Sequence, residues 1–245
     1  MRKFGLIGYP LGHSFSKKYF SEKFEKEGLD DCHFELYPIS EINQFPELLE
    51  NNPSLEGIAV TIPYKEKVIP YLDELDPACK AIGAVNSIKI KNGKLEGYNT
   101  DYIGFKNSLE NWLQNKAVKA LILGTGGASK AVSQALKTLN IQYLLVSRKK
   151  GLGRITYEEL AENPSILKEY ELVINSTPLG TFPKIEEMPD LPLKQITSKH
   201  LLFDLVYNPA ETTLMKAFLA AGGKAKNGLE MLEMQAEASW SIWNS

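Results

Sequence analysis

A glycine-rich turn between two apolar stretches is the part of the chain best suited to bind a ligand. Gly124 and Gly126 follow the apolar stretch 120–123, residues 130–139 have helical spacing, and a second apolar stretch covers 143–146. Strand, glycine turn, helix and strand in this order are typical of the first βαβ unit of a dinucleotide-binding fold. Glycines let the backbone approach a pyrophosphate, whose charge then lies at the helix N-terminus. A turn closed only for packing is the alternative, and the flanking strands favour binding.

The end of the second apolar stretch indicates which dinucleotide is bound. An NAD site has an acidic residue there, which accepts a hydrogen bond from the ribose 2′-hydroxyl. This chain has Ser147, Arg148 and Lys149 instead. Cations at this place suit a 2′-phosphate, because charge-assisted hydrogen bonds contribute about 1.5–3 kcal/mol each. The sequence therefore predicts NADP, and Lys150 is interpreted as a surface charge.

Lys65 is a candidate acid/base. It follows Thr61-Ile62-Pro63-Tyr64 at the end of the apolar stretch 57–62, and Pro63 suits the first position of a helix. We therefore expect Lys65 in the first helical turn, where the helix dipole disfavours its positive charge. That is the direction needed for a lysine that exchanges protons near neutral pH. A surface lysine is the plain alternative.

Other polar residues stand where predicted helices begin or meet an apolar face. Ser14 and Ser16 begin a predicted helix, and two hydroxyls at a helix N-terminus form a small anion site, although one of them also serves as N-cap. Asp101 precedes the predicted helix 103–115. It is a candidate site residue, and the alternative is that it is only the N-cap of that helix. Gln235 lies at the edge of the apolar stripe of the last helix, 229–243.

The elements that position these residues predict an α/β chain of two domains. Strands at 4–7, 34–39 and 57–62 alternate with helices, and Asn92-Gly93 predicts a hairpin between 87–91 and 94–98. The second domain begins near Lys116. Its remaining elements are strands at 172–175, 201–206 and 225–227, and a helix at 213–221.

Composition excludes several classes of protein. The 245 residues are 43% hydrophobic and 24% charged, with a net charge of −2, which gives no electrostatic case for nucleic acid or a membrane surface. No apolar run reaches the roughly 18 residues of a transmembrane helix. Cys32 and Cys79 have no metal-binding spacing, so no metal site is predicted and a cytoplasmic location is expected.

Several motifs in this order resemble the shikimate dehydrogenase family over nearly the whole chain. The motifs are Gly12-His13-Ser14-Phe15-Ser16, Val60-Thr61-Ile62-Pro63-Tyr64-Lys65, Ala84-Val85-Asn86, Asn99-Thr100-Asp101, residues 124–129, residues 175–180, Asp204-Leu205-Val206-Tyr207-Asn208-Pro209 and Met231-Leu232-Glu233-Met234-Gln235-Ala236. The resemblance implies reversible reduction of 3-dehydroshikimate to shikimate with NADPH, in aromatic amino-acid biosynthesis.

The resemblance also implies which segments of the chain bind substrate and which bind cofactor. An α/β substrate domain is expected at 1–102, with the C-terminal helix, 228–245, returning to it. A Rossmann-type, doubly wound NADP domain is expected at 103–227. The partners implied are small molecules, neither nucleic acid nor membrane, and the expected state is a monomer or homodimer.

Residue roles follow from the motif match. Lys65, paired with Asp101, would be the acid/base. Ser14 and Ser16 would hold the substrate carboxylate, with assistance from Tyr207. The ring hydroxyls would be bound by Thr61, Asn86, Asp101 and Gln235. The expected cofactor-binding residues are Gly124, Gly126, Gly127, Ala128, Ser129, Ser147, Arg148, Lys149, Asn175, Thr177 and Gly228.

The chain departs from the usual family pattern in three motifs. Lys17 replaces a proline after the second serine, Ala59 replaces an asparagine before Thr61, and Ser147-Arg148-Lys149 replaces Asn-Arg-Thr. Two alternatives stay open: a quinate/shikimate dehydrogenase of broader specificity, and a non-catalytic NADP-binding regulator on the same fold. Retention of Lys65 and Asp101 argues against the regulator, because a sensor needs no acid/base pair.

Overall fold

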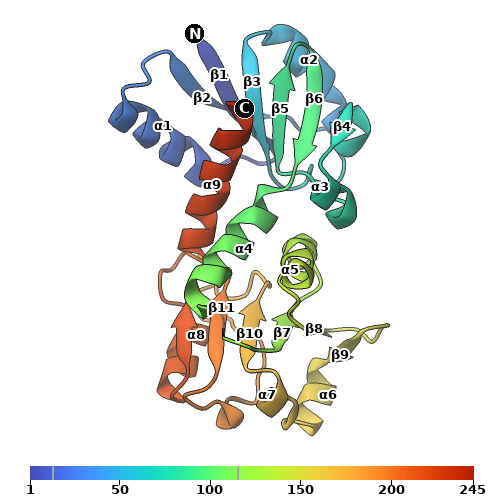
Figure 1. The fold of residues 1–245 in the computed structure, drawn as a ribbon, viewed down its shortest axis with the longest axis vertical. Coiled ribbons are helices and arrows are strands. Elements are labelled where there is room, and N and C mark those ends of the chain that lie inside the picture. The colour runs from blue at the N-terminus through green and yellow to red at the C-terminus, as the bar shows by residue number, and fades with distance from the viewer. Residues whose placement is uncertain (13, 115) are drawn as a thin grey trace. The chain divides into compact units, whose positions relative to one another are not determined.

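The computed structural model describes residues 1–12, 14–114 and 116–245. His13, from the serine motif, and Asn115, the expected end of a helix, lie outside the described residues. The chain divides into two compact units, Met1–Ile103 with Gln235–Ser245, and Gly104–Met234 (Figure 1). Both boundaries fall inside helices, α4 (Thr100–Leu113) and α9 (Leu229–Trp243). Residues 228–234, expected with the first unit, belong to the second.

The first unit is built on a mixed six-stranded sheet of order β2-β1-β3-β5-β6-β4. β1 runs parallel to both β2 and β3, whereas β5 is antiparallel to β3 and β6. Its strands are β1 (Arg2–Gly8), β2 (Cys32–Pro38), β3 (Leu55–Val60), β4 (Glu74–Leu75), β5 (Ser87–Lys91) and β6 (Lys94–Tyr98). Its other elements are α1 (Phe15–Glu27), η1 (Ile42–Gln44), α2 (Phe45–Asn51), η2 (Ile69–Tyr71) and α3 (Pro77–Ile82).

Local chemistry explains several of these boundaries. Ser14 caps α1 by accepting a hydrogen bond from the backbone of Lys17, and Gly28 ends the helix at a positive φ of 66°. Asn92 and Gly93 also have positive φ, 53° and 76°, which is the requirement of the tight hairpin turn between β5 and β6. The predicted hairpin and the cap of α1 are therefore confirmed.

An aromatic core fastens the C-terminal part of α9 to the first sheet. Phe4 of β1 stacks on Trp243, with ring centroids 5.3 Å apart, and Phe20 of α1 stacks on Phe34 at 4.8 Å. A side chain at Gly57 has no room, because its Cβ would lie 2.4 Å from the Trp243 ring. Burial of each such aromatic ring contributes roughly 1.5–3 kcal/mol, so this contact holds Gln235–Ser245 in the first unit.

The second unit carries a fully parallel six-stranded sheet of order β12-β11-β10-β7-β8-β9. The strands are β7 (Ala120–Leu123), β8 (Tyr143–Ser147), β9 (Arg154–Thr156), β10 (Leu172–Asn175), β11 (Leu201–Asp204) and β12 (Lys224–Lys226). The helices are α5 (Gly127–Thr138), α6 (Tyr157–Glu162), α7 (Ile166–Glu169), η3 (Leu193–Gln195) and α8 (Thr213–Ala220). Since the strand order reverses beside β7, this is the doubly wound Rossmann arrangement.

The central strands of this sheet are buried on both faces. Every residue of β7, β10 and β11 is buried, as expected for a parallel sheet covered by helices. The carboxyl ends of β7, β8 and β10 then carry the glycine turn, Arg148 and the loop after Asn175. The α/β class, the Rossmann-type second sheet and the return of the C-terminal helix are therefore confirmed.

Several predicted boundaries are wrong. The expected helix at 103–115 begins at Thr100. The strand expected to reach residue 62 ends at Val60, so no helix begins at Pro63. Strands β4 and β9 and helices α6 and α7 were not predicted, because they are short and have no clear apolar period.

Candidate active site

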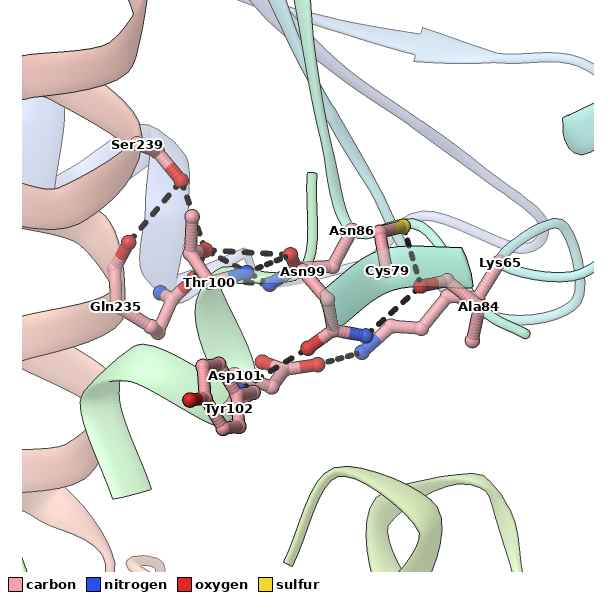
Figure 2. A network of polar contacts seen from close by, with 10 residues as sticks. All are labelled: Lys65, Cys79, Ala84, Asn86, Asn99, Thr100, Asp101, Tyr102, Gln235 and Ser239. Atoms are coloured by element: carbon pink, nitrogen blue, oxygen red, sulfur yellow. Dashed lines mark hydrogen bonds and ion pairs between the residues drawn. The ribbon is translucent and has the colours of Figure 1, made fainter. Parts of the chain in front are cut away.

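Lys65 and Asp101 form an ion pair in the first unit. Lys65 Nζ donates a hydrogen bond to Asp101 Oδ2 at 2.6 Å (Figure 2). The side chains are 32% and 21% exposed, so both are reachable by a small molecule yet shielded from bulk water. Such a pair can give a proton to a bound group, or take one from it, while the aspartate holds the ammonium in place.

Lys65 lies in a turn, not in the first turn of a helix as expected. The turn is held from two sides: the backbone N–H of Val85 donates to the Lys65 carbonyl at 2.7 Å, and that of Tyr64 donates to the Thr61 carbonyl at 2.9 Å. Tyr64 is 2% exposed, and its hydroxyl donates a hydrogen bond to the Ile39 carbonyl. The helix-dipole argument for Lys65 is therefore wrong.

Asp101 lies in the first turn of α4, and the capping role falls to its neighbour Asn99. Asn99 Oδ1 accepts from the backbone N–H of Tyr102 at 3.0 Å, while its Nδ2 donates to the Ala84 carbonyl at 2.9 Å (Figure 2). The alternative reading of Asp101 as the N-cap is therefore wrong. Because Asn99 satisfies the helix end, the carboxylate of Asp101 is left for Lys65.

Asn86 and Gln235 meet beside this pair. Asn86 Nδ2 lies 3.4 Å from Gln235 Oε1, and Asn86 Oδ1 accepts from the backbone N–H of Thr100 at 2.6 Å. Thr100 Oγ1 is 3.0 Å from Ser239 Oγ, which in turn donates to the Gln235 carbonyl (Figure 2). The sequence prediction missed Thr100 and Ser239. The spacing of Ser239, four residues after Gln235 on one helix, was the available signal.

The remaining predicted substrate residues lie at the ends of other elements. Ser14 is the N-cap of α1 and Ser16 lies in its first turn, both partly exposed. Thr61 directly follows β3 and donates its backbone N–H to the Ile7 carbonyl at 3.0 Å. Tyr207 follows β11 in the second unit and is 40% exposed. Lys17, one of the family departures, pairs with Glu35 at 2.9 Å.

A cavity of about 460 Å³ opens at the glycine turn of the second unit. Five of the predicted cofactor residues line it: Gly124, Gly126, Ser147, Arg148 and Thr177. It is also lined by residues that were not predicted, Thr125, Tyr157, Ser176, Pro178 and Leu179. We call this cavity the glycine-turn pocket. Tyr157 begins α6, after the unpredicted strand β9, so no local pattern pointed to it.

The glycine turn leaves a helix N-terminus open. Gly124 has a φ of 99°, and a Cβ there would lie 3.0 Å from a methyl of Thr177. Gly126 is the N-cap residue of α5, and no side chain of the described residues caps this helix end. Since the first N–H groups of a helix need acceptors, this end of α5 suits the oxygens of a phosphate.

The charge at the mouth of the pocket is positive. Arg148 is exposed and follows Ser147, and none of the described residues that line the pocket is acidic. Ser147 Oγ accepts from the backbone N–H of Lys149, whose exposed side chain is not part of the lining. Lys150 pairs with Glu159 at 2.8 Å. Burial raises the pKa of Tyr157 to about 12, so this phenol stays neutral near pH 7.

The other predicted cofactor residues are not part of the pocket lining. Gly127, Ala128 and Ser129 form the first turn of α5, and Ser129 Oγ donates to the Gly126 carbonyl at 2.6 Å. Asn175 is fully buried. A Cβ on Gly228 would lie 2.2 Å from the Leu205 carbonyl oxygen, so close packing requires glycine there. Cofactor contact by these residues stays a prediction.

The described residues contain neither a metal-binding cluster nor a membrane-spanning helix. Within 1–12, 14–114 and 116–245, no group of three histidine, cysteine, aspartate or glutamate side chains is placed to hold a metal ion. In the same part of the chain, no helix has the length and apolar character needed to cross a membrane.

Comparison with known sequences decides the family. Residues 6–88 match the model of the shikimate dehydrogenase substrate-binding domain. The NADP(+) shikimate dehydrogenase of Carboxydothermus hydrogenoformans is 38% identical over 98% of this chain and 90% of its own length. The chain belongs to the shikimate dehydrogenase family. The NADP(+) shikimate dehydrogenase of Halothermothrix orenii is 39% identical over 98% of this chain and 89% of its own length.

Solved structures of the family share the whole fold. A chorismate mutase/shikimate 5-dehydrogenase fusion protein from Clostridium acetobutylicum has a TM-score of 0.88, with 36% identity over 99% of this chain and 91% of its own. Shikimate 5-dehydrogenase from Thermus thermophilus, solved with NADP(H) and shikimate, has a TM-score of 0.86, with 29% identity over 99% of this chain and 93% of its own.

The fold alone does not fix the substrate. A 5-ketofructose reductase of Gluconobacter is 22% identical and has a TM-score of 0.84. The substrate therefore depends on the site residues rather than on the architecture.

Proposed function

We propose that this protein catalyses the reversible reduction of 3-dehydroshikimate to shikimate with NADPH, a step of aromatic amino-acid biosynthesis. The observation that carries the proposal is the Lys65–Asp101 ion pair at 2.6 Å, in a chain of the shikimate dehydrogenase family. A binding protein needs no such pair, whereas reduction of a ketone needs a proton donor at the carbonyl oxygen. The NADP-binding regulator is therefore disfavoured.

Lys65 is the proton donor in this proposal. NADPH, held by the glycine turn and Arg148, would supply the hydride for the ketone carbon. Negative charge then develops on the carbonyl oxygen, and Lys65 Nζ stabilises that charge and gives it a proton. In the oxidation direction, Lys65 accepts the proton of the substrate hydroxyl. Asp101 orients the ammonium and is itself placed to accept a hydrogen bond from a hydroxyl.

Neutral polar groups around the pair would recognise the other substrate groups. We propose that Asn86, Gln235 and Thr61 bind the ring hydroxyls, because amides and hydroxyls both donate and accept. Ser14 and Ser16 at the N-terminus of α1 would hold the carboxylate, where the helix end favours negative charge. Tyr207 is assigned to the same carboxylate. A substrate without one of these groups leaves buried partners unpaired, which is the basis of discrimination.

The glycine-turn pocket has the groups that NADP requires. The open N-terminus of α5 would hold the pyrophosphate, and Arg148 would hold the 2′-phosphate. Ser147 stands where an NAD-binding chain has a carboxylate. Gly124, Gly126 and Thr177 line the pocket, while Gly127, Ala128, Ser129, Lys149, Asn175 and Gly228 complete the proposed cofactor set. We propose that the second unit, Gly104–Met234, binds the cofactor and that the first unit, Met1–Ile103 with Gln235–Ser245, binds the substrate.

We also propose that the protein acts in the cytoplasm on small molecules, as a monomer or homodimer. The net charge of −2 provides no attraction for nucleic acid, and Cys32 and Cys79 are both buried free thiols, as is usual in a reducing compartment.

The test is an oxidation assay followed at the absorbance of reduced nicotinamide. Purified protein is mixed with shikimate or quinate, each with NADP or NAD. We expect rapid reduction with shikimate and NADP. Comparable rates with quinate would indicate the broader-specificity enzyme. NADP binding without turnover of either acid would instead indicate the regulator and contradict the proposal.

A further inference from the structure

A buried carboxylate lies behind the glycine-turn pocket. Asp204, the last residue of β11, is fully buried. Its Oδ1 accepts from Asn175 Nδ2 at 2.9 Å and from the backbone N–H of Val206 at 3.1 Å, and its Oδ2 accepts from Thr212 Oγ1 at 2.6 Å. Removal of a carboxylate from water is costly, and burial raises the pKa of Asp204 while these three donors oppose that rise.

Asn175 joins this carboxylate to the wall of the pocket. Its Nδ2 donates to Asp204, and its Oδ1 accepts from the backbone N–H of Thr177 at 3.0 Å and from Thr177 Oγ1 at 2.7 Å. The backbone N–H of Leu179 then donates to Thr177 Oγ1 at 3.3 Å. Thr177 and Leu179 both line the pocket, so the chain of hydrogen bonds runs from Asp204 to the ligand-facing loop.

The two ends of an asparagine amide have nearly the same shape, and neighbours decide which end points where. The carboxylate of Asp204 accepts but does not donate, so it holds the NH₂ end of Asn175 toward itself. The carbonyl end must then face Thr177, where two donors meet it. With the amide reversed, oxygen would face oxygen at Asp204 and NH₂ would face N–H at Thr177.

We propose that Asp204 is a positioning residue for cofactor binding: it fixes the orientation of the Asn175 amide and thereby the shape of the Thr177–Leu179 side of the pocket. The identity of the ligand as NADP rests on the proposed function. Asp204 touches neither ligand nor reacting atoms in this role and acts only through Asn175.

The sheet itself does not need this side-chain pair. Asn175 and Asp204 are direct neighbours across the parallel strands β10 and β11, and the backbone ladder already joins these strands. The ladder continues past the pair, because the Leu205 N–H donates to the Asn175 carbonyl at 3.0 Å. The side chain of Asn175 therefore acts mainly on the loop that follows it, whereas that of Asp204 also holds the backbone of Val206 and the hydroxyl of Thr212.

The test compares Asp204→Ala with Asp204→Asn in the full chain. We expect Asp204→Ala to raise KM for NADP by roughly tenfold or more, because it removes a charge-assisted hydrogen bond that orders the pocket. KM for shikimate should change less than about twofold. Asp204→Asn should recover most of the affinity, since its carbonyl can accept from Asn175 and its NH₂ can donate to Thr212.

His200→Ala is the matched control. His200 immediately precedes β11, at the opposite end of that strand from Asp204, and is 3% exposed. Its Nε2 lies 2.8 Å from the Leu167 carbonyl oxygen, so the variant also loses buried hydrogen bonds. We expect a lower Tm with an unchanged KM for NADP. An equal rise of that KM in His200→Ala would show general loosening of the sheet and overturn the proposal.

An unchanged KM for NADP in Asp204→Ala would also overturn the proposal that Asp204 positions Asn175. If Asp204→Ala does not fold, Asn175→Asp carries the test, because the new carboxylate repels Asp204 and loses the NH₂ donor. We expect it to raise KM for NADP as Asp204→Ala would, and an unchanged value contradicts the proposal. Failure of the wild-type protein to bind NADP would refute the proposed function instead, so the two failures are distinguishable.

Discussion

Lys65 and Asp101 contact each other at 2.6 Å although they come from different segments of the first unit. Both segments are fixed to neighbouring residues, Lys65 through the backbone N–H of Val85 and the first turn of α4 through the contact of Asn99 with Ala84. The Ala84–Val85 segment therefore holds both members of the proposed acid/base pair.

Lys65→Ala should lower kcat by roughly 10²–10⁴, the usual share of general acid/base catalysis. The ammonium is the group that stabilises and protonates the developing oxyanion, and alanine supplies neither function. Lys67→Ala is the matched control, because Lys67 is an exposed lysine of the same turn. Initial rates at saturating NADP and shikimate measure the effect. Turnover near wild type in Lys65→Ala would remove this lysine from the mechanism.

Arg148→Ala should raise KM for NADP by about ten- to a hundredfold, the equivalent of about 1.5–3 kcal/mol for a lost charge-assisted hydrogen bond. KM for NAD should hardly change, since NAD has no 2′-phosphate. Lys150→Ala serves as control, because Lys150 forms an ion pair with Glu159. Equal effects on both cofactors, measured under the same conditions, would place Arg148 away from the 2′-phosphate.

Asn99→Ala should affect both folding and turnover. Loss of the α4 cap and of the contact with the Ala84 carbonyl should lower the free energy of unfolding by about 1–3 kcal/mol. The same change releases the helix turn that holds Asp101, so we expect kcat to fall roughly tenfold. Urea unfolding and initial rates measure the two effects.

The matched control for Asn99 is Asp76→Ala. Asp76 caps α3 by accepting from the backbone of Ala78 at 2.9 Å, and it contacts neither Lys65 nor Asp101 in the described structure. This variant should lose stability while it keeps its kcat. A similar fall of kcat in both variants would mean that turnover follows stability, and that Asn99 has no particular influence on Asp101.

We expect Tyr157 to lower the free energy of unfolding in alkaline solution. Burial raises its pKa from an ordinary 10.0 to about 12. In the window between these values the unfolded chain has lost the proton and the folded chain still holds it, so the free energy of unfolding decreases as pH rises. Denaturation at pH 9 and pH 11 should show this loss. Tyr157→Phe should show a smaller loss of stability between these pH values. A loss identical to that of the wild type would exclude Tyr157 as the source of the effect.

Local sequence patterns were sufficient for the first βαβ unit of the second sheet. The buried stretch Ala120–Leu123, the glycine turn and α5 lie next to one another in the chain, so their period and spacing predicted the βαβ unit. Ser147 and Arg148 stand where an NAD-binding chain has an acidic residue, and this feature is likewise local. These features needed no knowledge of distant contacts.

The errors lie where distant contacts decide the backbone. Pro63 suits a helix start, but hydrogen bonds from Tyr64 to Ile39 and from Val85 to Lys65 hold a turn there instead. Tyr157 reaches the pocket through a strand that the sequence did not predict. The role of Asp204 depends on its pairing with Asn175 across two strands. No periodicity within a single segment reveals these partners.

The most direct measurement is the reaction in its biosynthetic direction. Wild-type protein is mixed with 3-dehydroshikimate and NADPH, the absorbance of reduced nicotinamide is followed, and the product is identified by NMR. We expect NADPH consumption that equals the shikimate formed, and almost none in Lys65→Ala. NADPH binding without shikimate formation by the wild type, or equal rates in both proteins, would contradict the central claim that the Lys65–Asp101 pair serves this reduction.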